Sequence, residues 1–109
     1  AGDDANIFTA LALGGAGAMA ASGHVHTARL VALMQQVVRG ELSAAQALWR
    51  PLQPLIEALF AEPNPGPVKA LLAQQGLMQA ELRAPMTSAS AELTARLAAI
   101  SAALEASPR

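Results

Sequence analysis

The feature that most constrains this chain is a run without charged residues near its amino end. Residues 5–23 contain no Asp, Glu, Lys or Arg, and a helix of that length would nearly cross a bilayer. The run also holds several glycines, and the pair Gly14-Gly15 would break such a helix in its middle. Alanine and glycine contribute little transfer free energy. We therefore expect no membrane span here and, since no basic region precedes the run, no secretory signal.

Composition narrows the class of protein further. The chain has 109 residues, the size of one domain, and a net charge of −1, so it lacks the basic excess of a nucleic-acid binder. It contains no cysteine, which excludes disulfides and thiolate metal sites and fits a reducing compartment, so we expect a cytoplasmic protein. Charged residues make up 14% of the chain, against about 25% in an ordinary domain. Part of its apolar surface is therefore expected to pack against something outside this chain.

Apolar periodicity and turn residues predict a mainly α-helical chain. Asp3 or Asp4 can cap the first helix, with Gly14-Gly15 as its stop. The uncharged segment Gly17–Ala21 is expected to form one short strand that is buried on both faces. The expected helices span residues 5–13, 27–39, 43–60, 67–76 and 91–106, with a loop over residues 77–90.

The third of these helices carries two special signals. Ser43 and Gln46 have the spacing of a capping box at its start. Pro51 and Pro54 lie inside its apolar stripe, so we expect a bend near residues 47–50 and one continuous helix.

Few residues indicate chemistry. Lys69 is the only lysine, but an amine nucleophile needs a lowered pKa, and this lysine follows a proline-rich loop at the start of a helix, so we expect a structural or solvated side chain. His24 and His26 would face the same way on an extended segment and could share a metal ion. No third ligand lies nearby in sequence, so ordinary histidines are favoured and we expect no metal or cofactor. Asp3-Asp4 is either a helix cap, the favoured interpretation, or part of a polar site at the end of a strand.

Four motifs follow one another along nearly the whole chain. They are Gly2-Asp3-Asp4, Leu13-Gly14-Gly15-Ala16-Gly17, Asn64-Pro65-Gly66-Pro67-Val68-Lys69 after Leu59-Phe60-Ala61-Glu62, and Arg83-Ala84-Pro85-Met86-Thr87. Together they resemble the carboxy-terminal portion of the dihydrodipicolinate synthase / N-acetylneuraminate lyase family of class I, pyruvate-dependent aldolases. The element ending in Lys69 is the most specific of the four.

The resemblance implies an α/β (β/α)8 barrel followed by a small helical domain. A full barrel takes about 250 residues, so this chain would be its last piece. Residues 1–40 would carry the seventh helix, the eighth strand and the eighth helix, and residues 41–109 would form the C-terminal helical domain. Gly17–Ala21 would be the eighth strand, with its neighbouring strands missing.

The resemblance also implies an activity and a site. The family joins pyruvate to a lysine near the end of the sixth strand as a Schiff base; that lysine would lie upstream of residue 1, so the chain alone should be inactive. Gly2, Asp3 and Asp4 match the loop on the second-substrate side, and Met19 matches the residue whose carbonyl lies beside pyruvate. Pyruvate, an aldehyde and other copies of the enzyme are the implied partners, with no nucleic acid and no membrane.

Departures from the family pattern bear on the substrate. Ala20 stands where many relatives have serine, His24 where they have asparagine, and Gly66 where isoleucine is frequent. We therefore expect a related aldolase or lyase of undefined aldehyde specificity. The alternative is an autonomous helical interaction or oligomerisation module, rich in alanine and leucine, without catalysis.

Overall fold

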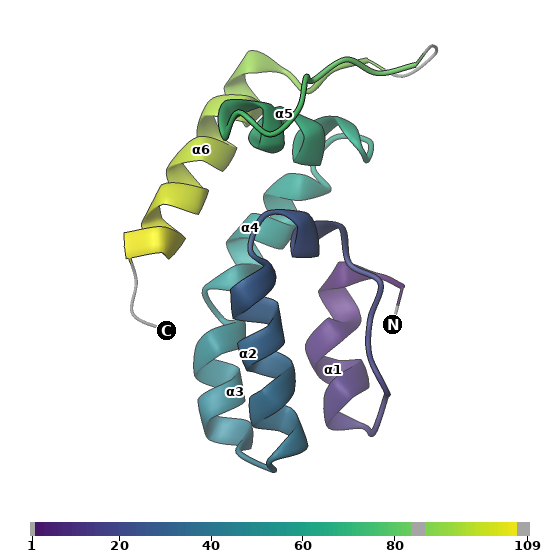
Figure 1. Cartoon of the computed structure of the whole chain (residues 1–109), viewed down its shortest axis with the longest axis vertical. Coiled ribbons are helices and arrows are strands. Elements are labelled where there is room, and N and C mark those ends of the chain that lie inside the picture. The colour runs from purple at the N-terminus through teal and green to yellow at the C-terminus, as the bar shows by residue number, and fades with distance from the viewer. Residues whose placement is uncertain (1, 84–86, 107–109) are drawn as a thin grey trace. The chain divides into compact units, whose positions relative to one another are not determined.

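The computed structural model describes residues 2–83 and 87–106, and every regular element within these ranges is a helix (Figure 1). The chain divides into two compact units between Gln53 and Pro54. Of the helices in the described ranges, none is both long and apolar enough to cross a bilayer.

Three α-helices build the first unit: α1 (Ile7–Ala12), α2 (Thr27–Val38) and α3 (Leu42–Trp49). The central helix, α2, packs against both α1 and α3 (Figure 1). The rings of Phe8 and Trp49 lie 6.1 Å apart at a tilt of 52°. The buried apolar side chains of this unit are Ile7, Leu11, Leu33, Ala45, Trp49 and Leu52.

The first helix differs from its prediction at its start. It opens with a 3-10 turn, η1 (Asp4–Asn6), before α1 begins at Ile7. Asp3 has the extended backbone of an N-cap residue, with φ −121° and ψ 117°, but its side chain makes no capping hydrogen bond. The Asp4 carboxylate instead bonds backbone groups much further along the chain. The capping role predicted for Asp3 or Asp4 is therefore wrong, whereas the second helix is confirmed to within one residue.

The predicted strand is absent from the described part of the chain. Residues 15–20 have no regular secondary structure, and Ala21, expected at the strand's end, begins a second 3-10 helix, η2 (Ala21–His24). Ala20 nevertheless keeps the extended backbone of a strand residue, with φ −127° and ψ 125°. A strand exists only when a neighbour accepts and donates its ladder hydrogen bonds, and no other segment among the described residues is a strand. The local conformation is thus close to that of a strand, without the pairing.

The third predicted helix is divided in two. It begins at Leu42 with Glu41 at the N-cap, so Ser43 lies inside the helix and the predicted capping box is wrong. It ends at Trp49, and α4 (Leu52–Leu59) follows after a two-residue turn at Arg50-Pro51. Pro51 has no N–H to bond the carbonyl four residues back and its ring collides with that carbonyl. The proline therefore breaks the helix where a bend was expected.

The second unit contains most of α4, together with α5 (Gly66–Gln74) and α6 (Ala91–Ala106), which pack against each other. Both later helices are confirmed, and the predicted loop is confirmed over residues 77–83 and 87–90. Residues 84–86 of the Arg83–Thr87 motif lie outside the described residues. The buried apolar side chains of the second unit are Leu55, Ile56, Ala58, Leu59, Val68, Ala70, Leu71, Leu93, Leu97 and Leu104.

Gly66 occupies a tight position at the start of α5. A Cβ atom at this position would lie 3.3 Å from the carbonyl oxygen of Thr87. The segment before α6 therefore passes close over the start of α5, and a larger side chain would require it to move.

Candidate functional site

The four residues that the resemblance assigns to the substrate site lie in two chain segments, and the Asp4 side chain connects these segments. Asp4 is 2% exposed, and its carboxylate accepts the backbone N–H of Ala21 at 3.2 Å and that of Ser22 at 2.8 Å. Ala21 follows Met19 by two residues. The Asp4 carboxylate therefore ties the segment that holds Gly2 and Asp3 to the segment that holds Met19.

Asp3 and Gly2 have a different environment from Asp4. Both are exposed, and the Asp3 carboxylate accepts a hydrogen bond from the side-chain amide of Asn6 at 3.2 Å. The Asp3 carbonyl accepts the backbone N–H of Asn6 at 3.0 Å, which closes the first turn. Of the two neighbouring carboxylates, only that of Asp3 faces solvent, where a ligand can reach it.

Met19 lies in the extended segment before η2 with its side chain 85% exposed. The neighbouring residues Ala18 and Ala20 line a groove with α1 and α2, as the alternation of side chains along an extended segment requires. Met19 therefore points away from the two helices.

The two histidines and Lys69 lie in different environments. His24 is exposed and His26 is buried, and no group of three or more metal-ligating side chains occurs among the described residues. The Lys69 ammonium donates a hydrogen bond to the backbone carbonyl of Glu81. This contact braces the loop after α5, which is the structural role expected for Lys69.

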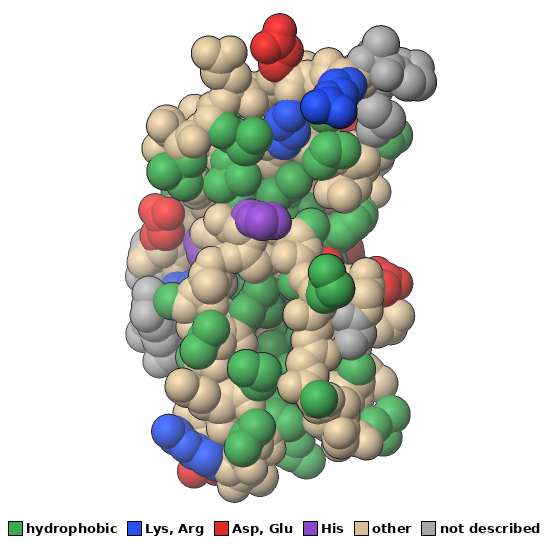
Figure 2. Space-filling view, turned by 45° about the vertical axis from the view of Figure 1, so that its right-hand side comes forward, with side chains coloured by type: hydrophobic (Ala, Val, Ile, Leu, Met, Phe, Trp, Pro, Cys, Tyr) green, Lys and Arg blue, Asp and Glu red, His purple; other side chains and the backbone are tan. Residues whose placement is uncertain are grey.

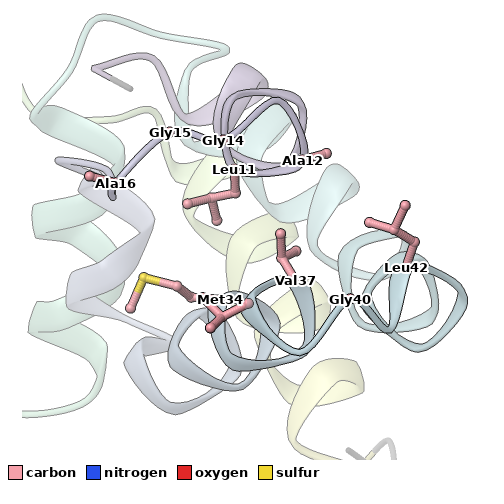
Figure 3. Close-up of a pocket in the computed structure, with 10 residues that line it drawn as sticks. Leu11, Ala12, Gly14, Gly15, Ala16, Met34, Val37, Gly40 and Leu42 are labelled. Atoms are coloured by element: carbon pink, nitrogen blue, oxygen red, sulfur yellow. The ribbon is translucent and has the colours of Figure 1, made fainter.

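Two apolar grooves lie in the first unit, apart from the polar residues. The larger has a volume of about 440 Å³, and Leu11 from α1 and Val37 from α2 point into the space between these helices (Figure 3). The smaller, of about 220 Å³, adjoins it and shares Leu11 and Met34. Neither groove is lined by Gly2, Asp3, Asp4 or Met19. Their walls carry no charged side chain, so they offer surfaces for packing and no reactive group.

Sequence reasoning misses the bonds that organise this site. A local pattern cannot reveal that Asp4 bonds residues 17 and 18 positions away. Likewise, the sequence predicts only that Ser90 is the last residue of a loop. In the structure the Ser90 hydroxyl accepts the N–H of Leu93 at 3.2 Å and so caps α6. A signal for this cap exists in the sequence, because a serine directly before an apolar-periodic run is a favoured N-cap.

Comparison with known proteins decides the family. The sequence profile of the dihydrodipicolinate synthetase family matches residues 1–104. The chain belongs to the dihydrodipicolinate synthetase family. It is 38% identical over 99 residues to 4-hydroxy-tetrahydrodipicolinate synthase of Listeria welshimeri and 40% identical over 98 residues to that of Teredinibacter turnerae. These alignments cover 91% and 90% of this chain but only 34% of each relative.

Solved structures of the dihydrodipicolinate synthetase family agree with this assignment. The crystal structure of dihydrodipicolinate synthase from Thermotoga maritima matches with a TM-score of 0.92 and 34% identity, over 95% of this chain and 35% of that one. The 4-hydroxy-tetrahydrodipicolinate synthase of Methylacidiphilum fumariolicum matches with a TM-score of 0.90 and 29% identity. This match covers 97% of this chain and 35% of the Methylacidiphilum chain. These neighbours are (β/α)8 barrels, and this chain spans about a third of their length. The matches do not favour a helical interaction module of unrelated origin.

Proposed function

We propose that this chain is the C-terminal part of a pyruvate-dependent aldolase or synthase that works through a Schiff base in the cytoplasm. The observation that carries the proposal is the family match over residues 1–104, together with relatives named as synthases at 38–40% identity. The chain alone is inactive, because the lysine that binds pyruvate belongs to the part of the enzyme before residue 1. The second substrate is an aldehyde.

In this proposal Gly2, Asp3, Asp4 and Met19 are the residues with which this chain forms the substrate-binding site. The first three shape the aldehyde side of the pocket, and the Met19 carbonyl lies beside pyruvate. The hydrogen bonds of Asp4 to Ala21 and Ser22 support this arrangement, because they hold the two groups of residues together in the first unit. Active sites of (β/α)8 barrels collect residues from several strand ends in this way.

The environment of Lys69 supports a nucleophile outside this chain. Lys69 is the only lysine, so no other residue of the chain can form a Schiff base through its side chain. Its ammonium group is engaged by the Glu81 carbonyl in the second unit, where it braces a loop. A Schiff-base lysine must present an unprotonated amine to a carbonyl substrate, and Lys69 lines neither of the two grooves described above.

Exposed apolar side chains support the proposal that further protein covers part of this chain. Leu13 and Met19 are 83% and 85% exposed, and Val38 is 81% exposed. Figure 2 shows hydrophobic side chains over much of the visible surface with few charged ones between them. Large apolar side chains that are this exposed gain free energy when further protein packs against them. We assign this covering to the rest of the barrel and to further copies of the enzyme, which is a homo-oligomer.

A chimera tests the proposed function. The part of the Listeria welshimeri synthase that precedes its match to this chain is joined to residue 1 of this chain. We expect the chimera, incubated with pyruvate and borohydride, to gain one reduced pyruvate adduct on a lysine of the Listeria part. We also expect it to consume pyruvate with at least one aldehyde of a panel that includes polar and apolar members. A folded chimera that forms no adduct would contradict the proposal. So would a folded chimera that fails to consume pyruvate with every aldehyde of the panel.

A further inference from the structure

We propose that Asp4 is a positioning residue, whose buried carboxylate fixes the aldehyde-binding loop to the end of the pyruvate-binding segment without touching either substrate. This inference rests on the proposed function and separates the roles of two adjacent aspartates that the family resemblance treats alike. In this assignment Asp3 contacts the aldehyde, and Asp4 determines where Asp3 stands.

Burial excludes Asp4 from direct contact with substrate. Its side chain is already 2% exposed in this chain, and packing against further protein can only reduce that exposure. Both carboxylate oxygens are used, one by each of two consecutive backbone N–H groups. A buried carboxylate is retained where hydrogen-bond donors compensate its lost hydration, and here the backbone supplies them. Each Asp4 carboxylate oxygen therefore already has a backbone partner without any ligand.

The Asp3 side chain is placed in the opposite way. It is exposed, and its described side-chain partner is the amide of Asn6 at 3.2 Å. A carboxylate can accept about four hydrogen bonds, so Asp3 keeps capacity for hydroxyl or amine donors of a substrate. The anchored carboxylate and the available one belong to adjacent residues, so any movement of the first displaces the second.

The two halves of the site depend on Asp4 to different degrees. In a complete barrel, Met19 would be held by strand neighbours on both sides. The loop at Gly2 and Asp3 has no such ladder, and the described long-range bonds near it are those of Asp4 to Ala21 and Ser22. Loss of these bonds should therefore loosen the aldehyde side of the pocket far more than the pyruvate side. A misplacement of about 1 Å can lower a rate on the order of 100-fold.

The variant Asp4→Asn tests this inference with little change of shape. It keeps one acceptor oxygen and turns the other into an NH2 group that faces a backbone N–H, so one of the two bonds is lost. Asp3→Asn is the matched control, because it makes the same change one residue away on the exposed carboxylate. Asp4→Glu restores the charge with one extra methylene, and it replaces Asp4→Asn if that variant fails to fold.

The first measurement is amide hydrogen exchange on this chain. We expect the amides of Ala21 and Ser22 to exchange about tenfold or more faster in Asp4→Asn than in the wild type or in Asp3→Asn. In Asp4→Glu, the exchange rates of these two amides should lie between those of the wild type and those of Asp4→Asn. Unchanged exchange in Asp4→Asn, or equal acceleration in Asp3→Asn, would overturn the anchoring role. This measurement needs no catalytic activity, so it decides the anchoring role even if the proposed function fails.

The second measurement uses the chimera and the aldehyde that it consumes fastest. Asp4→Asn should lower kcat/KM for the aldehyde by about 10- to 100-fold while the rate of pyruvate adduct formation changes less than about twofold. A merely structural residue would affect both substrates in proportion to the fraction of unfolded enzyme. Equal losses for pyruvate and aldehyde, or no loss for the aldehyde, would therefore overturn the inference. An inactive wild-type chimera would instead contradict the proposed function.

Discussion

The carboxylate of Glu62 accepts two hydrogen bonds from Ser90, one from the backbone N–H at 2.8 Å and one from the hydroxyl at 2.6 Å. The two residues lie 28 positions apart in sequence. Because the Ser90 hydroxyl also accepts the N–H of Leu93, the start of α6 is both capped and tied to the segment after α4. The side-chain bond from Ser90 and then its backbone bond hold the pKa of Glu62 below its ordinary value of 4.5; desolvation opposes them, and the charge of Arg96 adds the least.

The lowered pKa predicts an acid-sensitive contribution of Glu62 to stability. A carboxylate whose pKa is lower in the folded than in the unfolded chain stabilises the fold fully above the unfolded value, here about 4.5. That stabilisation is lost as the pH falls below this value through the folded pKa. The melting temperature, measured by circular dichroism, should decrease on acidification. We expect this decrease to be smaller in Glu62→Gln than in the wild type. Glu57→Gln, on an exposed carboxylate of α4, is the control; equal slopes for both variants would refute the link.

Ser90→Ala should destabilise the second unit by about 1 kcal/mol. The substitution removes the hydroxyl that accepts the Leu93 N–H, and loss of an N-cap acceptor has an effect of about this size. Chemical denaturation measures the change. In a double-mutant cycle with Glu62→Gln, we expect the two effects to be clearly non-additive, since the two side chains share one hydrogen bond. Strict additivity would show that this bond contributes nothing.

Gly15→Ala should weaken the turn after α1. A Cβ atom at this position would lie 2.8 Å from the carbonyl oxygen of Ala10, and the same oxygen accepts the Gly15 N–H at 2.8 Å. The backbone must shift to relieve this contact, at a cost of about 1–3 kcal/mol. At Gly17 an added Cβ meets nothing within 4 Å, so Gly17→Ala should change stability by less than about 0.5 kcal/mol. Thermal melts of the two variants that coincide would contradict the described turn.

Leu33→Ala should be the more damaging of two substitutions on α2. Leu33 is fully buried, and truncation of such a side chain typically costs about 2–5 kcal/mol through the cavity that it leaves. Val38, on the same helix, is 81% exposed, so Val38→Ala should cost less than about 0.5 kcal/mol. Urea denaturation gives both values. A larger loss for Val38→Ala would mean that this end of α2 is covered in the isolated chain.

The predictions that the structure confirms rest on local signals. The 3.6-residue periodicity of α2 and α6 and the proline at the start of α5 act within one or two turns, so the residues themselves define these helices. The break at Arg50-Pro51 is equally local, because a steric rule decides it. The apolar stripe over residues 43–60 predicts a continuous helix, but the steric effect of Pro51 outweighs that stripe. Each of these features depends on neighbours only a few residues away.

The features that the sequence could not predict depend on distant partners. Asp3 and Asp4 have the same side chain, and nothing local distinguishes the buried one from the exposed one. Their difference arises from Ala21 and Ser22, which lie 17 and 18 residues beyond Asp4. The segment Gly17–Ala21 has the composition of a buried strand, but a strand is a property of two chain segments, and its partner is not among the described residues. The family resemblance is needed to give that segment a role.

Borohydride trapping with pyruvate on this chain alone, followed by intact-mass measurement, tests whether the pyruvate-binding lysine lies outside the chain. We expect no stable adduct, because we propose that the Schiff-base lysine belongs to a preceding part of the enzyme and because Lys69, the only lysine here, braces a loop. The wild-type chimera, treated in parallel, should gain the mass of one reduced pyruvate. A specific, stoichiometric adduct on Lys69 of the isolated chain would show instead that Lys69 is the pyruvate-binding lysine.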